Sequence, residues 1–194
     1  MNTYLSSSII FHNDKITTKL QETFGDMEIP VMMDWEDSLM SASAAYVTQN
    51  GGDILEIGFG MGISAGYMHS HSIDSHTIVE NHPDIIPKAV EWASNKSNVT
   101  IISQSWYDVK DSLGTFDGVF YDTFEDENYK DFSSSLSTWT KSGTKVTFWN
   151  DDNGESNNHQ IQTSYQQINI TPPNSASVYF RSGDTIYYMP MKEF

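Results

Sequence analysis

The sequence contains no cysteine, which excludes disulfides, thiolate metal ligands and a cysteine nucleophile. Basic residues are scarce, since 10 Lys and Arg stand against 26 Asp and Glu, and the formal net charge is -16. That charge repels the phosphates of nucleic acids and anionic membrane surfaces, so we expect neither as a partner. It favours cationic partners, although a surface adapted for solubility has the same composition.

Long hydrophobic runs are missing as well. No stretch approaches the roughly 20 apolar residues of a membrane span, and the opening MNTYLSSSIIFHNDK lacks the basic start and apolar run of a signal peptide. We therefore expect a cytoplasmic protein without a membrane segment. The six histidines have no metal-site spacing, so no metal is expected. The sequence does not indicate an oligomeric state.

Apolar strand-like and helical stretches alternate along most of the chain. Strands are expected at 53–58, 76–80, 99–102, 116–122 and 144–150, and helices at 32–47, 61–71, 83–96 and 128–140. Pro83 is expected in the first turn of its helix. The tail contains the strand-like stretches YQQINI, SVYF and TIYYMPM. This order predicts a Rossmann-like α/β fold, with a mostly parallel sheet and an antiparallel C-terminal strand. Residues 1–30 are expected to form an N-terminal arm, and residues 31–194 a single domain.

The stretch ILEIGFGMG places glycines at alternate positions directly after the first predicted strand. A dinucleotide fingerprint needs G-x-G-x-x-G, and a P-loop needs Gly-Lys-Ser/Thr, so neither fits. The spacing E-x-G-x-G-x-G instead resembles the first motif of class I S-adenosylmethionine-dependent methyltransferases. The resemblance implies that Glu56, Gly58, Gly60 and Gly62 belong to the cofactor site. A tight turn without a ligand is the alternative.

Two further residues strengthen the cofactor hypothesis. Glu80 ends the second predicted strand, about 20 residues past the glycines, where a carboxylate can accept hydrogen bonds from ribose hydroxyls. Trp106 follows the third strand, where it could lie against an adenine ring, although a single Trp is more often part of a core.

Two carboxylates stand at unusual positions. Asp122 follows the apolar end of the fourth predicted strand, and ligands of open α/β sheets bind outside such strand ends. Glu36 interrupts the apolar face of the predicted helix at 32–47, where Met33, Met40 and Ala44 share its side. A solvated Glu36 at the edge of that face is the alternative.

Five segments together resemble the guanidinoacetate N-methyltransferase family and the related fungal-type arginine N-methyltransferases. They are VMMDWEDSLM, LEIGFGMG, IVENH, SWYDV and FDGVFYDTF, in this order between about Val31 and Asn150. TPP and TIYYMP are weaker matches in the tail. The resemblance implies that Glu36 and Asp122 hold a guanidino group, and that the cofactor is S-adenosylmethionine, converted to S-adenosylhomocysteine. It also assigns further residues to the cofactor site: Met32, Met40, Met61, Ile63, Glu80, Asn81, His82, Trp106 and Tyr107.

The chemistry of a guanidinium agrees with this assignment. Two carboxylates can hold the planar cation, orient one nitrogen toward the methyl donor, and accept the displaced proton, a role we expect for Asp122. Phe124 could form an apolar wall or simply pack. By resemblance the N-terminal arm folds over the site, and Phe11 is a candidate lid aromatic.

The substrate is less defined than the reaction. Asp151 and Asp152 stand where the guanidinoacetate enzymes hold a substrate carboxylate, which argues against guanidinoacetate itself. We expect a small guanidino substrate. Arginine in a protein is the alternative, and a non-catalytic cofactor-binding module is the third hypothesis.

Overall fold

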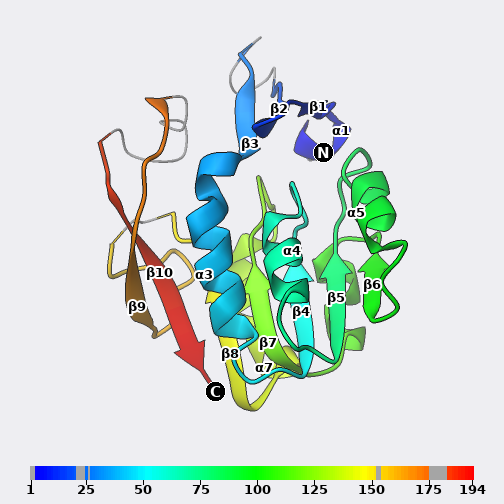
Figure 1. The fold of residues 1–194 in the computed structure, drawn as a ribbon, viewed down its shortest axis with the longest axis vertical. Coiled ribbons are helices and arrows are strands. Elements are labelled where there is room, and N and C mark those ends of the chain that lie inside the picture. Colours follow the sequence, from blue (N-terminus) through cyan, green and yellow to red (C-terminus); the bar gives the residue numbers. More distant parts are fainter. Residues whose placement is uncertain (1–2, 21–24, 26, 152–153, 175–182) are drawn as a thin grey trace.

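A central sheet carries the fold in this computed structural model, which describes residues 3–20, 25, 27–151, 154–174 and 183–194 (Figure 1). The strand order is β6-β5-β4-β7-β8-β10-β9. Strands β4 to β8 pair in parallel, and β10 pairs antiparallel with both β8 and β9. The predicted parallel sheet with antiparallel strands at its C-terminal side is therefore confirmed. The strands are β4 Asp53–Ile57, β5 Ser75–Val79, β6 Val99–Ile102, β7 Phe116–Tyr121, β8 Thr140–Phe148, β9 Ser164–Asn169 and β10 Ile186–Glu193.

Helices cover both faces of this sheet because its central strands bury apolar side chains on both sides. In β4, Ile54 belongs to the apolar cluster under α3, α4 and α5, whereas Leu55 and Ile57 belong to the cluster under α6 and α7. Alternate residues of a strand point to opposite faces, so one short apolar run serves both layers. The helices are α3 Asp37–Val47, α4 Ile63–His69, α5 Ile86–Ala93, α6 Trp106–Val109 and α7 Phe132–Trp139, with short 3-10 turns η1 Asp34–Glu36, η2 Lys110–Ser112 and η3 Tyr129–Asp131.

The N-terminal region forms a second, smaller sheet. Helix α1 (Thr3–Ser6) precedes the antiparallel strands β1 (Ile10–Phe11), β2 (Lys15–Thr18) and β3 (Ile29–Met33). In Figure 1 these elements lie beyond the ends of β5 and β7 to which the arrowheads point, which are the carboxyl ends. Strand β3 crosses the predicted arm boundary at residue 30, because Lys15 and Ile16 pair with Met33 and Met32.

Two predicted helix starts are wrong. Met32 and Met33 are extended in β3, and the helix begins only after η1, because strand pairing with β2 outweighs the helical periodicity of this stretch. Helix α5 begins at Ile86, and Pro87, not Pro83, occupies its first turn.

The other predicted elements match the structure within a few residues, apart from the strand-like SVYF at 177–180, which lies outside the described residues. Within the described ranges, no helix combines the length and apolarity that crossing a lipid bilayer requires.

Candidate functional site

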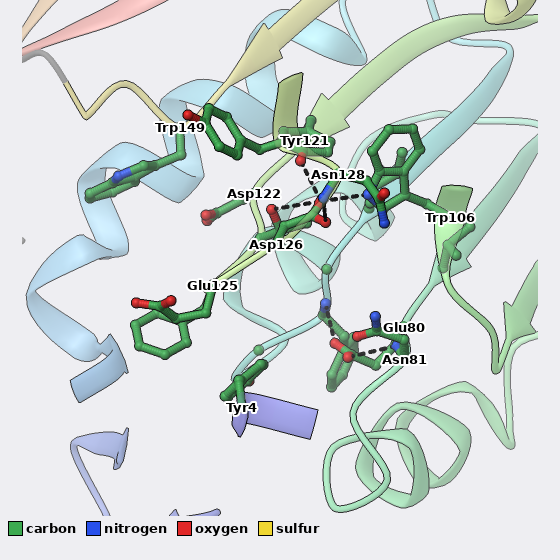
Figure 2. Close-up of a pocket in the computed structure, with 18 of the residues that line it drawn as sticks. Tyr4, Glu80, Asn81, Trp106, Tyr121, Asp122, Glu125, Asp126, Asn128 and Trp149 are labelled. Carbon is green, nitrogen blue, oxygen red and sulfur yellow. Dashed lines mark hydrogen bonds between the residues drawn. The ribbon is translucent and has the colours of Figure 1, made fainter. Parts of the chain in front are cut away.

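A cavity of about 710 Å³ lies at the carboxyl ends of the parallel strands, between the glycine turn and the N-terminal arm (Figure 2). The loops that follow β4, β5, β7 and β8 all contribute to its wall. Parallel strands present their carboxyl ends at one edge of the sheet, so residues distant in sequence meet here. Of the predicted site residues, the cavity is lined by Met32, Glu36, Gly58, Gly60, Glu80, Asn81, Trp106, Asp122 and Phe124.

The remaining predicted site residues are not among those that line the cavity. Met40 is 1% exposed within the core, and Gly62 caps the start of α4 with a left-handed φ of 73°. His82 is fully buried, and its Nε2 lies 3.2 Å from the carbonyl oxygen of Tyr4. The complete set of predicted residues that do not line the cavity is Met40, Glu56, Met61, Gly62, Ile63, His82 and Tyr107.

The glycine turn brings β4 against the end of β7. A Cβ atom on Gly58 would lie 1.9 Å from the carbonyl oxygen of Asp122, and its φ is +91°, a conformation that L side chains rarely adopt. A Cβ atom on Gly60 would lie 2.7 Å from Sδ of Met32. The alternate glycines therefore allow the turn to approach both the strand end that carries Asp122 and the strand that carries Met32.

Glu80 ties the glycine turn to the loop after β5. Its Oε2 accepts a hydrogen bond from the Phe59 amide at 2.9 Å, and its Oε1 accepts from the Asn81 and His82 amides at 2.9 and 2.8 Å. A carboxylate has about four lone-pair sites, so three amides leave room for one more donor. Glu80 is 6% exposed and lines the cavity, which leaves it able to accept from a single ligand hydroxyl.

Glu56 lies beneath the cavity floor and is completely buried. Its Oε1 accepts a short hydrogen bond from the Ser64 hydroxyl in the first turn of α4. Its Oε2 lies 2.9 Å from Nε2 of His76, which is equally buried, although the direction of this contact is outside hydrogen-bond geometry. Since Ser64 lines the cavity and Glu56 does not, the carboxylate of the first motif acts on the site through other side chains.

Glu36 reaches the cavity at the junction between β3 and α3. It is 4% exposed, and its Oε1 accepts a hydrogen bond from the Met33 amide at 2.8 Å. The bond closes the 3-10 turn η1, so Glu36 stands at a bend between two elements and not on a solvated helix face.

Asp122 directly follows β7 of the central sheet and lines the same cavity. Burial raises the pKa of its carboxyl group to about 7, and the negative charges of Asp151 and Glu56 add to the effect. Burial also raises the pKa of the Tyr187 phenol, with contributions from the charges of Asp122, Asp151 and Glu36. The structure therefore brings the two predicted carboxylates together around one cavity and one buried phenol.

The cavity wall is strongly acidic. Among the described residues that line it, none is Lys or Arg, and eight are acidic: Glu36, Glu80, Asp108, Asp122, Glu125, Asp126, Glu127 and Asp151. Asp151 is oriented by the Trp149 indole, whose Nε1 donates to its Oδ1 at 2.7 Å. Asp152, which was predicted to act with it, lies outside the described residues. Such a wall attracts a cation and repels a carboxylate.

Sequence reasoning missed Asp126, a lining residue that the tertiary structure makes prominent. Asp126 accepts hydrogen bonds from the Trp106 indole and the Tyr121 hydroxyl, both at 2.6 Å. The Trp106 side chain is also well packed: it is 3% exposed, and its ring contacts Tyr121 and Trp139. No local signal distinguished Asp126 from the other acids of the FEDE stretch.

The N-terminal arm reaches the cavity through α1, not through Phe11. Tyr4 and Leu5 line the cavity, and the Tyr4 ring packs edge-on against Phe124 with centroids 4.9 Å apart. Phe11 is 45% exposed, and the Lys88 ammonium lies over its ring at 5.7 Å from the centroid. The candidate lid aromatic is therefore Tyr4. Nothing in the serine-rich sequence around it distinguished it as a site residue.

The chain is similar in sequence to a family of known proteins. The family model "Guanidinoacetate N-methyltransferase" matches residues 11–148. The chain is 37% identical over 141 residues to "Protein arginine N-methyltransferase 2" of Aspergillus fumigatus, covering 69% of this chain and 31% of the relative. It is 33% identical over 139 residues to the Saccharomyces cerevisiae protein of the same name, covering 66% and 32%. The chain thus spans about a third of the length of these relatives.

Solved structures share the fold. Spermidine synthase from Thermotoga maritima superposes with a TM-score of 0.65 at 11% identity, covering 96% of this chain and 68% of that one. The N-methyltransferase NodS from Bradyrhizobium japonicum, in complex with S-adenosyl-L-homocysteine, superposes with a TM-score of 0.59 at 12% identity, covering 81% and 87%. At these identities the likeness concerns the fold alone.

Proposed function

We propose that this chain, which belongs to the guanidinoacetate N-methyltransferase family, transfers a methyl group from S-adenosylmethionine to a guanidino nitrogen. The observation that carries this proposal is the meeting of Glu36 and Asp122. They stand on opposite sides of the glycine turn in sequence, yet both line one cavity beside that turn. A non-catalytic module would not require a second buried carboxylate at this place.

The glycine turn and its neighbours fit the proposed cofactor. The turn has no side chains at Gly58 and Gly60 where it approaches the cavity, which leaves room for a compact amino-acid tail. Glu80 retains capacity for one ribose hydroxyl, and Trp106 forms part of the wall after β6. The cofactor supplies an electrophilic methyl group on a sulfonium and leaves as the thioether S-adenosylhomocysteine.

The two carboxylates would perform different parts of the reaction. A guanidinium is a planar cation with poorly nucleophilic nitrogens, and it must lose a proton when a methyl group is added. Glu36, held by the Met33 amide, would accept hydrogen bonds from one edge of the guanidinium and orient it. Asp122, whose pKa is raised to about 7, would take the proton as the new nitrogen–carbon bond forms and the sulfur–carbon bond breaks.

Charge also favours this assignment. Substrate and sulfonium are both cationic, so bringing them together in a neutral pocket would be unfavourable. The acidic lining offsets that repulsion. Its attraction for positive charge is greatest when that charge is concentrated near the reacting nitrogen. The N-terminal arm, through Tyr4 and Leu5, would limit the access of water.

The substrate that the wall supports best has no carboxylate near its guanidino group. An arginine side chain in a protein satisfies this condition, and the relatives in Aspergillus fumigatus and Saccharomyces cerevisiae are named as protein arginine methyltransferases. A small cationic guanidine is the second candidate, favoured by the arm that closes over the cavity. Guanidinoacetate is disfavoured because the negative charge of Asp151, which acts on Asp122, would repel its carboxylate.

The test is methyl transfer from labelled S-adenosylmethionine to a panel of acceptors: an arginine peptide with blocked termini, agmatine, free arginine and guanidinoacetate. We expect transfer to the first two and little to the last. Glu36→Gln and Asp122→Asn should each lower kcat by roughly 10²- to 10⁴-fold, the range for a lost general base or its partner. Affinity for S-adenosylhomocysteine should change by less than about threefold, because the cofactor contacts remain.

Glu91→Gln is the matched control, since it removes a carboxylate from an exposed side chain on α5 that lies outside the cavity. Transfer to no guanidine, with the cofactor bound normally, would point to a binding module. Wild-type rates in both Glu36→Gln and Asp122→Asn would refute the mechanism.

A further inference from the structure

Asp126 is the hydrogen-bonding centre of the loop after β7. Its Oδ2 accepts from Trp106 Nε1 and from the Tyr121 hydroxyl, both at 2.6 Å, and its Oδ1 accepts from the Asn128 amide at 2.8 Å. Figure 2 shows these three bonds converging on the one carboxylate. Hydrogen bonds to a charged acceptor are stronger than those between neutral groups, so this contact is well suited to fixing the loop.

The donors to Asp126 come from both sides of the proposed reaction centre. Trp106 begins α6 on the wall assigned to the cofactor, whereas Tyr121 ends β7 and directly precedes Asp122. The two rings pack edge-to-face with centroids 5.8 Å apart, and each residue is 3% exposed. Because one oxygen atom serves both donors, a displacement of either ring changes the geometry of the other's bond.

The backbone beside Asp126 is strained. Glu125 has a φ of 50°, in the left-handed region that residues with a Cβ atom rarely adopt. The segment from Asp122 to Asp126 is held at both ends: the Asp122 amide donates to Ile57 at 2.9 Å, and the Asp126 carboxylate is bound as described. In Figure 2, Asp122 and Glu125 extend toward the same side of this segment as the Trp149 ring.

The Tyr121 hydroxyl remains a donor under ordinary conditions. Burial raises the pKa of this phenol far above its usual range, and the charge of Asp126 adds to the effect. The Tyr121 ring also stacks on Phe132 with centroids 4.1 Å apart, which keeps the ring in place independently of its hydroxyl. The hydrogen bond to Asp126 can therefore be removed without removing the aromatic packing.

We propose that Asp126 is a positioning residue that couples the two ligands of the site. A cofactor that binds against Trp106 stabilises the form of the 122–126 loop in which Asp126 accepts its three hydrogen bonds, and this form binds the guanidino group more tightly. The inference rests on the proposed function and deepens it, because it predicts that the cofactor and the guanidine each tighten the binding of the other. Asp126 touches neither reacting atom. It acts through Trp106 and Tyr121 on the loop that carries Asp122.

The test is a binding linkage measured by calorimetry, without turnover. The affinity for agmatine, and for an arginine peptide with blocked termini, is measured in the absence and in the presence of saturating S-adenosylhomocysteine. We expect S-adenosylhomocysteine to tighten binding of the guanidine by roughly 5- to 150-fold in the wild type, the usual range for coupled sites. In Asp126→Asn the factor should fall below about threefold, because the amide cannot accept all three hydrogen bonds.

A second variant keeps the test decisive if Asp126→Asn folds poorly. Tyr121→Phe removes one donor while the stacked ring stays in place, and it should reduce the coupling factor partially. The double variant Asp126→Asn/Tyr121→Phe should be no weaker in coupling than Asp126→Asn alone, because both changes act on one network. Asp111→Asn, at an exposed carboxylate in η2, is the control that should retain full coupling.

Each outcome has a separate meaning. A purely structural role for Asp126 would lower stability and leave the coupling factor of the folded variants at the wild-type value, which would overturn the inference. A coupling factor of one in the wild type would also overturn it, while leaving the proposed function intact. Failure of the wild type to bind any guanidine, with or without S-adenosylhomocysteine, would overturn both.

Discussion

The carboxylates on the two sides of the cavity differ in the groups that surround them. On the side of β4 and β5, Glu80 accepts three backbone amides, and Glu56 is enclosed by Ser64 and His76. On the side of β7 and β8, Asp122 has a raised pKa and faces the like charge of Asp151. On the side of β4 and β5, donors of the protein itself therefore bind both carboxylates, and Glu80 keeps one acceptor site toward the cavity. On the side of β7 and β8, the charge of Asp122 is unfavourable until a cation binds.

The difference indicates where chemistry can occur. A buried carboxylate whose acceptor sites are filled by its own protein is a structural element, since a ligand must compete with those bonds. A carboxylate destabilised by burial and neighbouring charge gains most from a cationic ligand and is basic enough to accept a proton near neutral pH. The same functional group is thus bound by the protein beside the glycine turn, whereas at the end of β7 it has a raised pKa and is the proposed base.

The largest effect is expected on the side of β4 and β5. His76→Phe removes the ring nitrogen that lies 2.9 Å from the buried Glu56 carboxylate and leaves that charge without its partner, so it should lower the free energy of unfolding by about 3 kcal/mol. The double variant Glu56→Gln/His76→Phe should recover most of this loss, because no uncompensated charge remains. Urea denaturation measures both. If the double variant loses as much as the single variants Glu56→Gln and His76→Phe lose together, the two side chains do not act as a pair.

A smaller effect of opposite sign is expected in the reactive half. The folded-state pKa of Asp122, about 7, lies above the usual value of 3.8, so the folded protein loses stability as the pH rises between these values. Asp122→Asn removes that loss. The inactive variant should therefore be more stable than the wild type at pH 8, by roughly 1 to 4 kcal/mol since each pKa unit corresponds to 1.36 kcal/mol.

At pH 4 the two proteins should be about equally stable, because this pH lies close to the unfolded-state pKa of 3.8, where the loss of stability only begins. Thermal denaturation of the ligand-free proteins at the two pH values tests this. A lower melting temperature of Asp122→Asn at pH 8 would place Asp122 with the structural carboxylates.

The smallest effect concerns Asp151, whose charge is one cause of the raised pKa of Asp122. If deprotonated Asp122 is the base, kcat/KM should rise about tenfold per pH unit below pH 7 and level off above it. Asp151→Asn should move this inflection to lower pH by less than about one unit, as expected for one exposed charge. Glu91→Gln should leave it in place. A shift toward higher pH would contradict the assigned cause.

Much of this site could be predicted from the sequence because parallel strands share one edge. Gly58, Glu80, Trp106 and Asp122 each follow a strand, and that position alone predicted that they would meet. Glu36 depended on family resemblance, since its helical face proved to be a strand, a 3-10 turn and a helix in succession. Strands β2 and β3 are not adjacent in sequence, and no local pattern predicted that they pair.

What the sequence alone determined was the order of strands and helices, the excess of acids, and which residue types stand at the strand ends, because these depend on local periodicity and composition. Only the tertiary structure decided which carboxylates are bound by donors of the protein and which one has a raised pKa. Glu56, Glu80, Asp122 and Asp126 differ in the donors that distant segments bring to them. The free energy of a buried charge depends on those neighbours, and the neighbours exist only once the chain has folded.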